Sequence, residues 1–492
     1  MSSSSSRGLL YRLSRGLHAS PAGRTLKRGA RALFPALYYR LYEQTGAGNA
    51  PSVPPSAAEG TTPPAPERWT ERLSDAERDD LFVVRTFDAT PEVIRANAAR
   101  NEAFLRSGAP VRSVNWFIPA PEHAMFAGVR TILRFAERLQ TAHGVENRIV
   151  IYNLPHISPE KVRGIEEAVP SLKGRVLVYS GERPLDDEIP AADAAVATLW
   201  TSAYYVAPLR SPRATFYFVQ DYEPLFYAGG STSGVCEATY RMGFVRIANT
   251  PGLLEHVVHS HGGGGTSFVP AIDRAVYYRP DPATDPRFAA DGRQRPVRIF
   301  FYARPKESRN GFLLGLEALR HVKAKYGDRV DIVTAGGAWD ERDYGVENVL
   351  KNLGRLASLE EVADLYRSCD VGLVFMFSKH PSYQPFEFMA CGCCVVTNTN
   401  DATTWLLRDG ENAVVTDTPV SSVAASIGRL VEDPGLRRRL ADSAYHSLPT
   451  AAWDDIIDDT LRRAGLLPAA RADAVPPSER TIPHDEPAAR PA

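Results

Sequence analysis

The feature that most constrains the fold of this chain is the regular alternation of short apolar runs with helix-like stretches. The run SVNWFIP begins at Ser113 and is followed by AMFAGVRTILRFAERLQ, whose apolar residues recur at helical spacing. Further β-like runs are RIVIYN, RVLVYS, AAVATLW, ATFYFVQ, VRIANT and TSFVPAI. Strands that alternate with helices predict an α/β fold in which helices cover both faces of a parallel sheet.

A second series of the same kind starts at VRIFFYARP and continues through RVDIVTAG, VGLVFMF and CVVTN. A chain of 492 residues exceeds what one hydrophobic core usually holds. We therefore expect two Rossmann-like, doubly wound domains facing a central cleft, at residues 73–273 and 296–467. A linker rich in Pro, Asp and Arg, at 274–295, would join them. Ligands of such sheets gather at the carboxyl ends of the strands.

The two ends of the chain have another composition. Residues 1–72 comprise a basic segment with no acidic residue before Glu43, followed by a linker rich in Pro, Ala and Ser. Its arginines alternate with Leu, Phe and Tyr, so it could contact an anionic membrane surface. A disordered tail without a partner and a mitochondrial presequence remain open alternatives. Residues 468–492 resemble the linker, and neither segment can bury enough apolar surface to fold.

Charge and cysteine usage restrict the class of protein. The formal net charge of −1 gives no field that would attract nucleic acid. Five cysteines are bunched rather than spaced as a disulfide framework, which favours a reducing, cytoplasmic setting. No apolar run reaches the roughly 18 residues that a membrane-spanning helix requires. We therefore expect a cytoplasmic protein, with the inner face of the cell membrane as an alternative place for the basic tail.

Three features of the second series indicate a phosphorylated ligand. Arg304 and Arg309 lie between a strand and a helix, so two guanidinium groups and a helix N-terminus could face one anion. Glu387 heads the helix-like run EFMACG and could accept hydrogen bonds from two hydroxyl groups. The small residues that follow allow a close approach of the backbone. The alternatives are that both arginines are solvated in a loop and that Glu387 is an ordinary charge at a helix N-terminus.

Two other patterns invite a metal interpretation that we do not favour. Cys391 and Cys394 form a CxxC that follows a helix, and no second pair stands at a suitable spacing, so packing of small residues is favoured. His259 and His261 lack a third ligand and are expected to be loop residues. We expect no obligatory metal or other cofactor.

Longer motifs carry a resemblance to a known family. EFMACGCCVV, ARPKESRNGFLLGLEAL and NLGRLASLEEVADLYRSCDVGL resemble the donor-binding half of GT-B glycosyltransferases of the retaining family 4 class. FVQDYEPLFYAGGSTSGVCEATYRMGF, FMFSKHPSYQPFEFMACG and NTNDATTWLLRDGENAVV resemble WsaF-type rhamnosyltransferases, which build rhamnose-containing surface glycans. The resemblance covers roughly Ser113 to Leu466. It implies a GT-B fold and a nucleoside diphosphate sugar as donor.

The resemblance also implies roles for the residues of the second domain. Glu387 would hold the ribose hydroxyls, and Arg304 with Arg309 would bind the diphosphate. The segment Gly354 to Ser358, which includes Leu356, would face the base. Tyr383 belongs to the same predicted donor site, as does Lys379, although Lys379 occupies the place of a family glutamate that serves the sugar. The donor sugar is therefore less defined than the nucleotide, and L-rhamnose is consistent with this departure.

The first domain supplies the expected acceptor side. FVQDYEP ends a strand with Asp221, Tyr222 and Glu223 at the rim where an acceptor should sit. We expect Asp221 to be the catalytic residue, with Tyr222 and Glu223 as acceptor-binding candidates. The alternative is that Asp221 caps the following turn. Gly128 stands where a strand-to-helix loop would approach the donor diphosphate.

These residues lead to one expected reaction and two rivals. We expect transfer of a sugar, L-rhamnose from dTDP-rhamnose by resemblance, to a growing glycan that is either free or carried on a lipid. Retention of the anomeric configuration is implied by the family. The rivals are a nucleotide-sugar-binding scaffold without turnover, because Lys379 breaks the glutamate pair, and a nucleotide-sugar epimerase of similar architecture.

Overall fold

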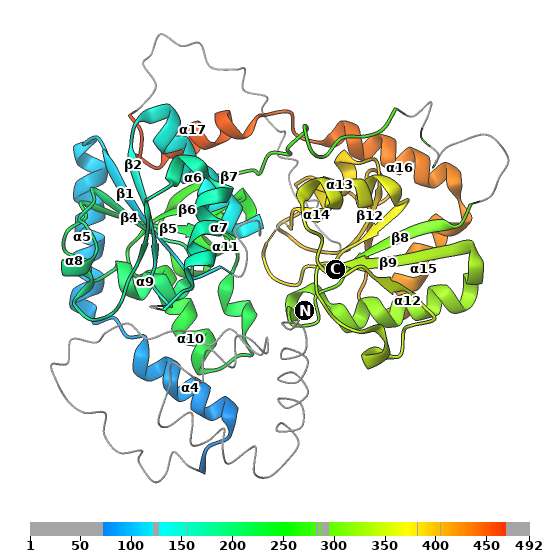
Figure 1. The fold of residues 1–492 in the computed structure, drawn as a ribbon, viewed down its shortest axis with the longest axis horizontal. Helices are drawn as coiled ribbons and strands as arrows, with labels where there is room; N and C mark the ends of the chain where they lie inside the picture. The colour runs from blue at the N-terminus through cyan, green and yellow to red at the C-terminus, as the bar shows by residue number, and fades with distance from the viewer. Residues whose placement is uncertain are drawn as a thin grey trace, which may run out of the picture.

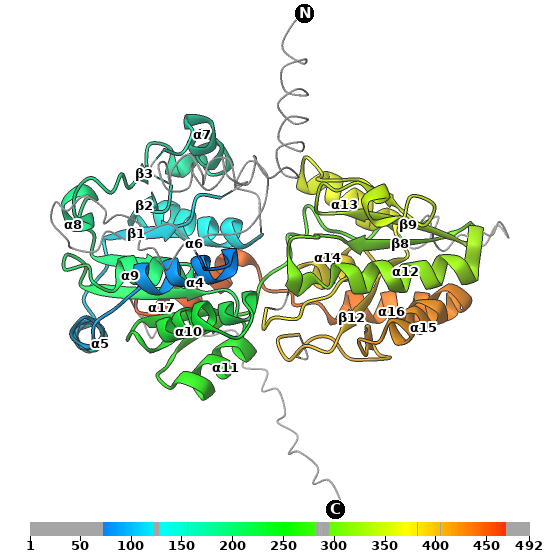
Figure 2. The ribbon, with the colours of Figure 1, turned by 90° about the horizontal axis from the view of Figure 1, so that it is seen from below.

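The computed structural model describes residues 72–468 apart from 122–126, 155, 282–284, 286, 288–294, 381 and 404. Two α/β lobes stand side by side (Figure 1), each built on a parallel sheet. A view turned by 90° keeps the two lobes apart and joined along one narrow zone (Figure 2). The predicted basic tail with its membrane contact and the C-terminal tail lie outside the described residues. Among the described helices, none is long and apolar enough to cross a membrane.

The N-terminal lobe has a seven-stranded parallel sheet in the order β3-β2-β1-β4-β5-β6-β7. Its strands are buried on both faces, with one apolar cluster on each side, as expected for a parallel sheet covered by helices. The strands are β1 (Ser113–Ile118), β2 (Glu146–Ile151), β3 (Val176–Val178), β4 (Ala194–Ala197), β5 (Ala214–Val219), β6 (Val245–Asn249) and β7 (Gly265–Phe268). The helices between them are α6 (Ala127–His143), α7 (Pro159–Ala168), α8 (Leu185–Glu188), α9 (Trp200–Val206), α10 (Ser231–Ala238) and α11 (Pro251–His261).

Two helices before β1 were not predicted from the sequence. They are α4 (Asp75–Thr86) and α5 (Pro91–Ser107). Ser74 begins α4 with a capping box to Glu77, and Thr90 caps α5. The two amides of Asn97 and Asn101 bind Thr215 of β5, which fixes α5 to the sheet. Polar side chains therefore help to attach this helix, alongside the apolar Phe104, which is buried in the core.

The C-terminal lobe has a six-stranded parallel sheet in the order β10-β9-β8-β11-β12-β13. Its order reverses between β8 and β11, so their carboxyl ends open a crevice, as in other doubly wound sheets. The strands are β8 (Val297–Tyr302), β9 (Val330–Ala335), β10 (Lys351–Asn352), β11 (Val371–Leu373), β12 (Cys394–Asn398) and β13 (Val414–Thr416). The covering helices are α12 (Phe312–Tyr326), α13 (Leu359–Ser368), α14 (Gln384–Ala390), α15 (Val420–Glu432) and α16 (Pro434–Ser447).

The last helix, α17 (Trp453–Arg463), belongs to the opposite lobe from the one predicted. Ile457 and Leu461 are buried in the same apolar cluster as Trp116 of β1, and α17 lies on the N-terminal lobe in Figure 1. Arg138 of α6 donates two hydrogen bonds to Asp458 at 2.8 Å each. The sequence-based range 296–467 is therefore corrected, because residues 453–467 complete the core of the N-terminal lobe.

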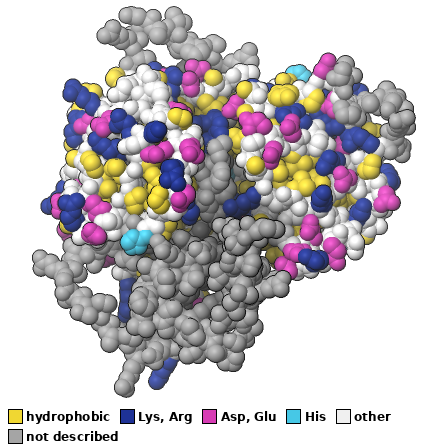
Figure 3. Space-filling view, in the orientation of Figure 1, with side chains coloured by type: hydrophobic (Ala, Val, Ile, Leu, Met, Phe, Trp, Pro, Cys, Tyr) yellow, Lys and Arg dark blue, Asp and Glu magenta, His cyan; other side chains and the backbone are white. Residues whose placement is uncertain are grey.

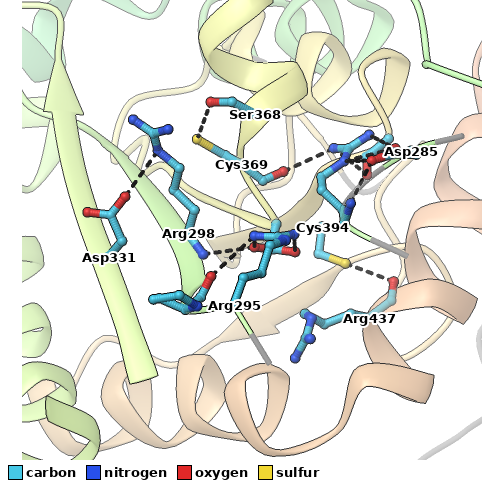
Figure 4. Close-up of polar contacts among 12 residues, drawn as sticks. Asp285, Arg295, Arg298, Asp331, Ser368, Cys369, Cys394 and Arg437 are labelled. Carbon is cyan, nitrogen blue, oxygen red and sulfur yellow. Dashed lines mark hydrogen bonds and ion pairs between the residues drawn. The ribbon is translucent and has the colours of Figure 1, made fainter. Parts of the chain in front are cut away.

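The segment predicted as a linker is anchored to the base of the C-terminal lobe. Arg287 pairs with Asp285 at 2.6 Å and donates to the carbonyl oxygens of Cys369, Cys391 and Gly392. Arg295 reaches Asp370, which also accepts a hydrogen bond from the backbone of Arg298 (Figure 4). The part of this connection that precedes β8 is thus held by two ion pairs, and the pair between Arg287 and Asp285 is buried. All five cysteines are free and buried.

Candidate active site

The carboxyl ends of the two sheets face each other, and side chains from both lobes meet between them. Ser378, after β11, donates a hydrogen bond of 2.7 Å to Asp221, after β5. The Tyr383 hydroxyl lies 3.0 Å from the Thr131 hydroxyl and 3.1 Å from the Asn249 amide. In the space-filling view, Lys and Arg side chains line the boundary between the lobes (Figure 3). The predicted site residues Asp221 and Tyr383 therefore both lie where the lobes meet.

Asp221 is almost fully enclosed at this boundary, with 6% of its surface exposed. Burial raises the pKa of its carboxyl to about 6, and nearby Arg309 and the hydrogen bond from Ser378 oppose the rise. One carboxyl oxygen accepts the backbone N–H of Tyr222 at 2.7 Å, and the other accepts from Ser378. Asp221 thus makes the local contact expected of a turn residue and also faces the opposite lobe.

The two neighbours of Asp221 are differently placed. Glu223 is 2% exposed and accepts hydrogen bonds from the backbone of Trp200 at 2.6 Å and from the Tyr217 hydroxyl at 2.9 Å. Burial raises the pKa of Glu223 to about 8. These contacts leave almost no surface of Glu223 for an acceptor glycan to touch. Tyr222 stacks on Tyr240, and its hydroxyl lies 3.0 Å from Nε2 of His261.

The two histidines expected in a loop are part of a helix. His259 and His261 form the last turn of α11, and His261 is fixed between Tyr222 and Arg241. Burial lowers the pKa of His261, so its hydrogen bonds rather than a charge account for its position. Within the described ranges, no group of three or more His, Cys, Asp or Glu side chains is placed to hold a metal ion.

Arg304 and Arg309 come together around one carboxylate. Glu307 lies 3.1 Å from Arg304 through one oxygen and 3.1 Å from Arg309 through the other. The Arg309 guanidinium also lies 4.5 Å from the ring centre of Phe226, which belongs to the N-terminal lobe. The sequence therefore predicted two cations on one junction, whereas the shared acidic partner becomes visible only in the structure.

Glu387 stands in the first turn of α14 and borders a small cavity. Burial raises the pKa of its carboxyl to about 7, while a hydrogen bond with Tyr277 and the charge of Arg130 oppose the rise. The cavity has a volume of about 70 Å³, too small for a nucleotide, since ligand pockets usually exceed roughly 300 Å³. Its lining from both lobes includes Arg130, Thr131, Arg134, Asp273, Tyr277, Leu359, Tyr383, Glu387 and Trp453.

The residues predicted to face the base lie in the loop before α13, close to this cavity. Gly354 has a positive φ of 72°, which favours glycine, and no neighbour would meet a side chain there. Leu356 is partly buried against the core of the C-terminal lobe. Leu359 begins α13 and reaches the cavity lining. The loop thus borders the Glu387 cavity through Leu359.

Gly128 lies in the first turn of α6, at the edge of the N-terminal sheet that faces the other lobe. A Cβ atom placed on Gly128 would come within 3.3 Å of the Gln220 amide nitrogen. The Gln220 carbonyl oxygen is buried without a hydrogen-bond partner among the residues that the structure describes. Gly128 therefore lets α6 begin close against the end of β5.

The sequence predicted only some of the residues that hold the loop after β11. Lys379 forms an ion pair of 2.6 Å with Asp401. His380 follows it, and Asn400 holds the backbone of this loop through hydrogen bonds to three carbonyl groups. Sequence reasoning noted His380 only as the neighbour of Lys379 and missed Asn400, Arg130 and Tyr277. The motif NTN was visible, but its role depends on a fold that brings β11 and β12 side by side.

Two family models match the two lobes described above. The model described as WsaF, N-terminal domain, matches residues 113–250, and the model described as WsaF, C-terminal domain, matches residues 297–428. The chain contains both WsaF domains. Asp221 lies in the first matched range, and Arg304, Arg309 and Glu387 lie in the second. The resemblance inferred from sequence motifs is thereby confirmed at the level of the WsaF domains.

Two curated relatives match different lengths of the chain. The O-antigen biosynthesis protein RfbC of Myxococcus xanthus is 43% identical over 413 residues, or 82% of this chain. The chain spans about a third of the length of that relative, since the match covers 31% of it. A D-inositol 3-phosphate glycosyltransferase of Thermomonospora curvata is 33% identical over 101 residues, 20% of this chain and 23% of that protein.

Solved structures show the same arrangement of two lobes. HepE from Anabaena, solved with UDP-glucose, has a TM-score of 0.54 and 16% identity, covering 71% of this chain and 99% of HepE. A variant of S. aureus TarM, solved with fondaparinux, α-GlcNAc-glycerol and UDP, has a TM-score of 0.56 and 7% identity, covering 72% and 99%. At these identities the likeness concerns the fold. The predicted GT-B fold is confirmed.

Proposed function

We propose that this chain is a glycosyltransferase that moves a sugar from a nucleoside diphosphate sugar to a growing surface glycan. One observation carries the proposal: at the boundary where both sheets end, Ser378 of the C-terminal lobe donates a hydrogen bond of 2.7 Å to Asp221, and Arg309 lies 4.5 Å from the ring centre of Phe226 in the short helix just after Asp221. A cation for a leaving diphosphate and a carboxylate for an acceptor hydroxyl thus share one place. RfbC, an O-antigen biosynthesis protein by name, supports a glycan as the product.

The donor would occupy the C-terminal side of this boundary. Glu387 would accept hydrogen bonds from the ribose hydroxyls, and Arg304 and Arg309 would bind the diphosphate in place of Glu307. HepE and TarM were solved with UDP-glucose and UDP respectively, which supports a nucleotide in this fold. The cavity beside Glu387 must widen to admit a nucleotide, so we expect the lobes to part on binding and to close again.

The chemistry would join the acceptor oxygen to the anomeric carbon while the bond from that carbon to the phosphate oxygen breaks, and the retention that the family implies requires both events on the same face of the sugar. The two arginines would stabilise the negative charge that develops on the diphosphate, so no obligatory metal is proposed. Asp221, with its pKa raised to about 6, is ionised at neutral pH and would receive the proton of the acceptor hydroxyl. Enclosure between the lobes would limit hydrolysis of the donor.

The finer assignments follow the sequence resemblance. We propose dTDP-L-rhamnose as donor, because the WsaF-type motifs resemble those of rhamnosyltransferases and Lys379 departs from the glutamate of the wider class. We propose a glycan acceptor carried on a lipid or free, and a cytoplasmic place of action, with the basic N-terminal segment contacting the inner face of the membrane. We propose Tyr222, next to Asp221, as a residue that contacts the acceptor.

The deciding experiment is incubation of the purified chain with dTDP-L-rhamnose, dTDP-glucose, UDP-glucose and UDP-GlcNAc. Thermal shift measures binding, and mass spectrometry measures donor consumption with and without glycan acceptors. Acceptor-dependent transfer is expected. Binding without turnover would instead support a scaffold, and an altered donor sugar without acceptor would support an epimerase.

A further inference from the structure

The loop that joins β11 to α14 is fixed in an unusual conformation. The Asn400 amide donates hydrogen bonds to the carbonyl oxygens of Met376 at 3.2 Å, Ser378 at 3.0 Å and His380 at 3.1 Å. Ser382 has a positive φ of 52°, a backbone region that residues other than glycine seldom adopt. Such conformations persist where the surroundings enforce them, and they are concentrated at functional sites. The side chain of Asn400 therefore holds the backbone of this loop without using the His380 ring.

The ring of His380 has one nitrogen engaged within its own loop. Nδ1 accepts the backbone N–H of Ser382 at 2.9 Å, so in the neutral ring the proton resides on Nε2. Burial, followed by the charge of Arg309, lowers the pKa of His380 to about 3, which keeps the ring neutral at physiological pH. No hydrogen-bond partner for Nε2 is found within the described residues. His380 thus presents an oriented, uncharged donor.

Charged and polar residues around His380 indicate which part of a bound nucleotide sugar would lie near its Nε2–H group. Arg309 lies close enough to influence both His380 and Asp221. Ser378, two residues earlier in the same loop, binds Asp221 across the boundary. Lys379 precedes His380 in the sequence and forms an ion pair with Asp401. Its charge also helps to lower the pKa of His256 on α11. His380 therefore lies in the loop that contacts the proposed catalytic carboxylate through Ser378, and within electrostatic range of the proposed diphosphate cation Arg309.

We propose that His380 determines which sugar is transferred, by donating its Nε2–H hydrogen bond to an oxygen of the glycosyl group. This inference rests on the proposed function. The diphosphate already has Arg304 and Arg309, whereas the group between diphosphate and acceptor is an uncharged sugar that needs neutral hydrogen-bond partners. A site built to hydrogen-bond one hydroxyl disfavours a sugar that lacks it or displays it elsewhere, because the buried polar group is then left unpaired.

Two substitutions of His380 separate the role of the Nε2–H donor from that of Nδ1, which accepts the Ser382 N–H. His380→Asn keeps an oxygen near the place of Nδ1 to accept the Ser382 N–H but removes the donor at the place of Nε2. His380→Gln places an amide N–H near the place of Nε2. Binding of dTDP and of UDP alone, measured by calorimetric titration, reports on the nucleotide site. Binding and steady-state transfer of the best nucleotide sugar from the panel above report on the glycosyl group.

The expected result for His380→Asn is unchanged affinity for the free nucleotide and roughly tenfold weaker binding of the nucleotide sugar, the size of one lost hydrogen bond. His380→Gln should recover most of that loss. An Asn variant that binds the nucleotide sugar like the wild type would overturn the inference. So would equal losses for free nucleotide and nucleotide sugar, since the ring would then serve the loop or the phosphates. If the wild type binds no nucleotide sugar, the proposed function itself fails.

Discussion

Replacing Glu387 by Gln should stabilise the C-terminal lobe above pH 7 and at the same time weaken nucleotide binding. Burial raises the pKa of Glu387 from 4.5 to about 7. At roughly 1.4 kcal/mol per pKa unit, this corresponds to about 3.5 kcal/mol against the ionised form. Because the side chain is only half-buried, we reduce the expected gain to about 2 kcal/mol. Gln can still accept the hydrogen bond from Tyr277 without the cost of burying a charge.

The sign of the pH dependence follows from proton binding. The folded chain holds the Glu387 proton more tightly than the unfolded chain, so wild-type stability falls as pH rises from 4.5 to about 7. The variant lacks this loss, and its advantage should grow from near zero at pH 4 to about 2 kcal/mol at pH 8. Urea unfolding of the wild type and the variant at pH 4 and pH 8 measures the difference in their free energies of unfolding. Glu360→Gln, at an exposed position on α13, is the control, and its free energy of unfolding should stay within about 0.5 kcal/mol of the wild-type value.

The binding half of this prediction uses the same variant. Calorimetric titration with dTDP and UDP at pH 8 should show roughly tenfold weaker binding, because an amide oxygen replaces a carboxylate that would accept two ribose hydrogen bonds. An equal stability difference at pH 4 and pH 8 would refute the buried-charge argument. Unchanged nucleotide affinity would refute the placement of the ribose at Glu387.

Four further outcomes are expected, one of them for a control variant. Asp458→Asn should cost about 2 kcal/mol of stability at pH 7, since hydrogen bonds from Arg138 lower the pKa of Asp458 from 3.8 to about 2, and this contribution should vanish as pH falls through that range. Asp454→Asn, which removes a more exposed carboxylate from the same arginine, should cost less than about 0.5 kcal/mol by the same denaturation assay. Arg309→Ala should weaken dTDP or UDP binding at least tenfold in calorimetry while thermal unfolding stays cooperative, and retained affinity would count against a diphosphate there. Asp221→Asn should reduce kcat for glycan transfer about a hundredfold with nucleotide binding preserved, and an unimpaired kcat would remove Asp221 from the chemistry.

The strands of the N-terminal sheet, and β8, β9, β11 and β12 of the C-terminal sheet, could be predicted because parallel strands are buried on both faces and therefore read as short continuous apolar runs. The short edge strands β10 and β13 were not predicted. RIVIYN and ATFYFVQ correspond to β2 and β5. The helix α17 was also recognisable from its apolar stripe. Its partner was not, because helical periodicity shows that a face is buried without showing which surface covers it. Residues Ile457 and Leu461 fit a core of either lobe until the chain path is known.

The site was predictable to the extent that it depends on positions at strand ends. Arg304, Arg309 and Asp221 follow strands, and parallel topology places them near the boundary. Side-chain direction was not predictable. Glu223 stands two residues after Asp221 and points to the backbone of Trp200, because the chain turns into a short 3-10 helix at this position. The role of His380 depends on contacts between residues that are separated in sequence.

The return of α17 to the N-terminal lobe decides how this molecule can be divided. A recombinant N-terminal lobe that ends in the linker would lack α17. It would expose the apolar surface that Trp453, Ile457 and Leu461 cover, and it should aggregate or require detergent to stay in solution. The sequence from 297 to 450 could instead be excised or exchanged as a cassette, since both of its ends leave from the same neighbouring body. Chimeras that swap donor preference should therefore be cut at two points rather than one.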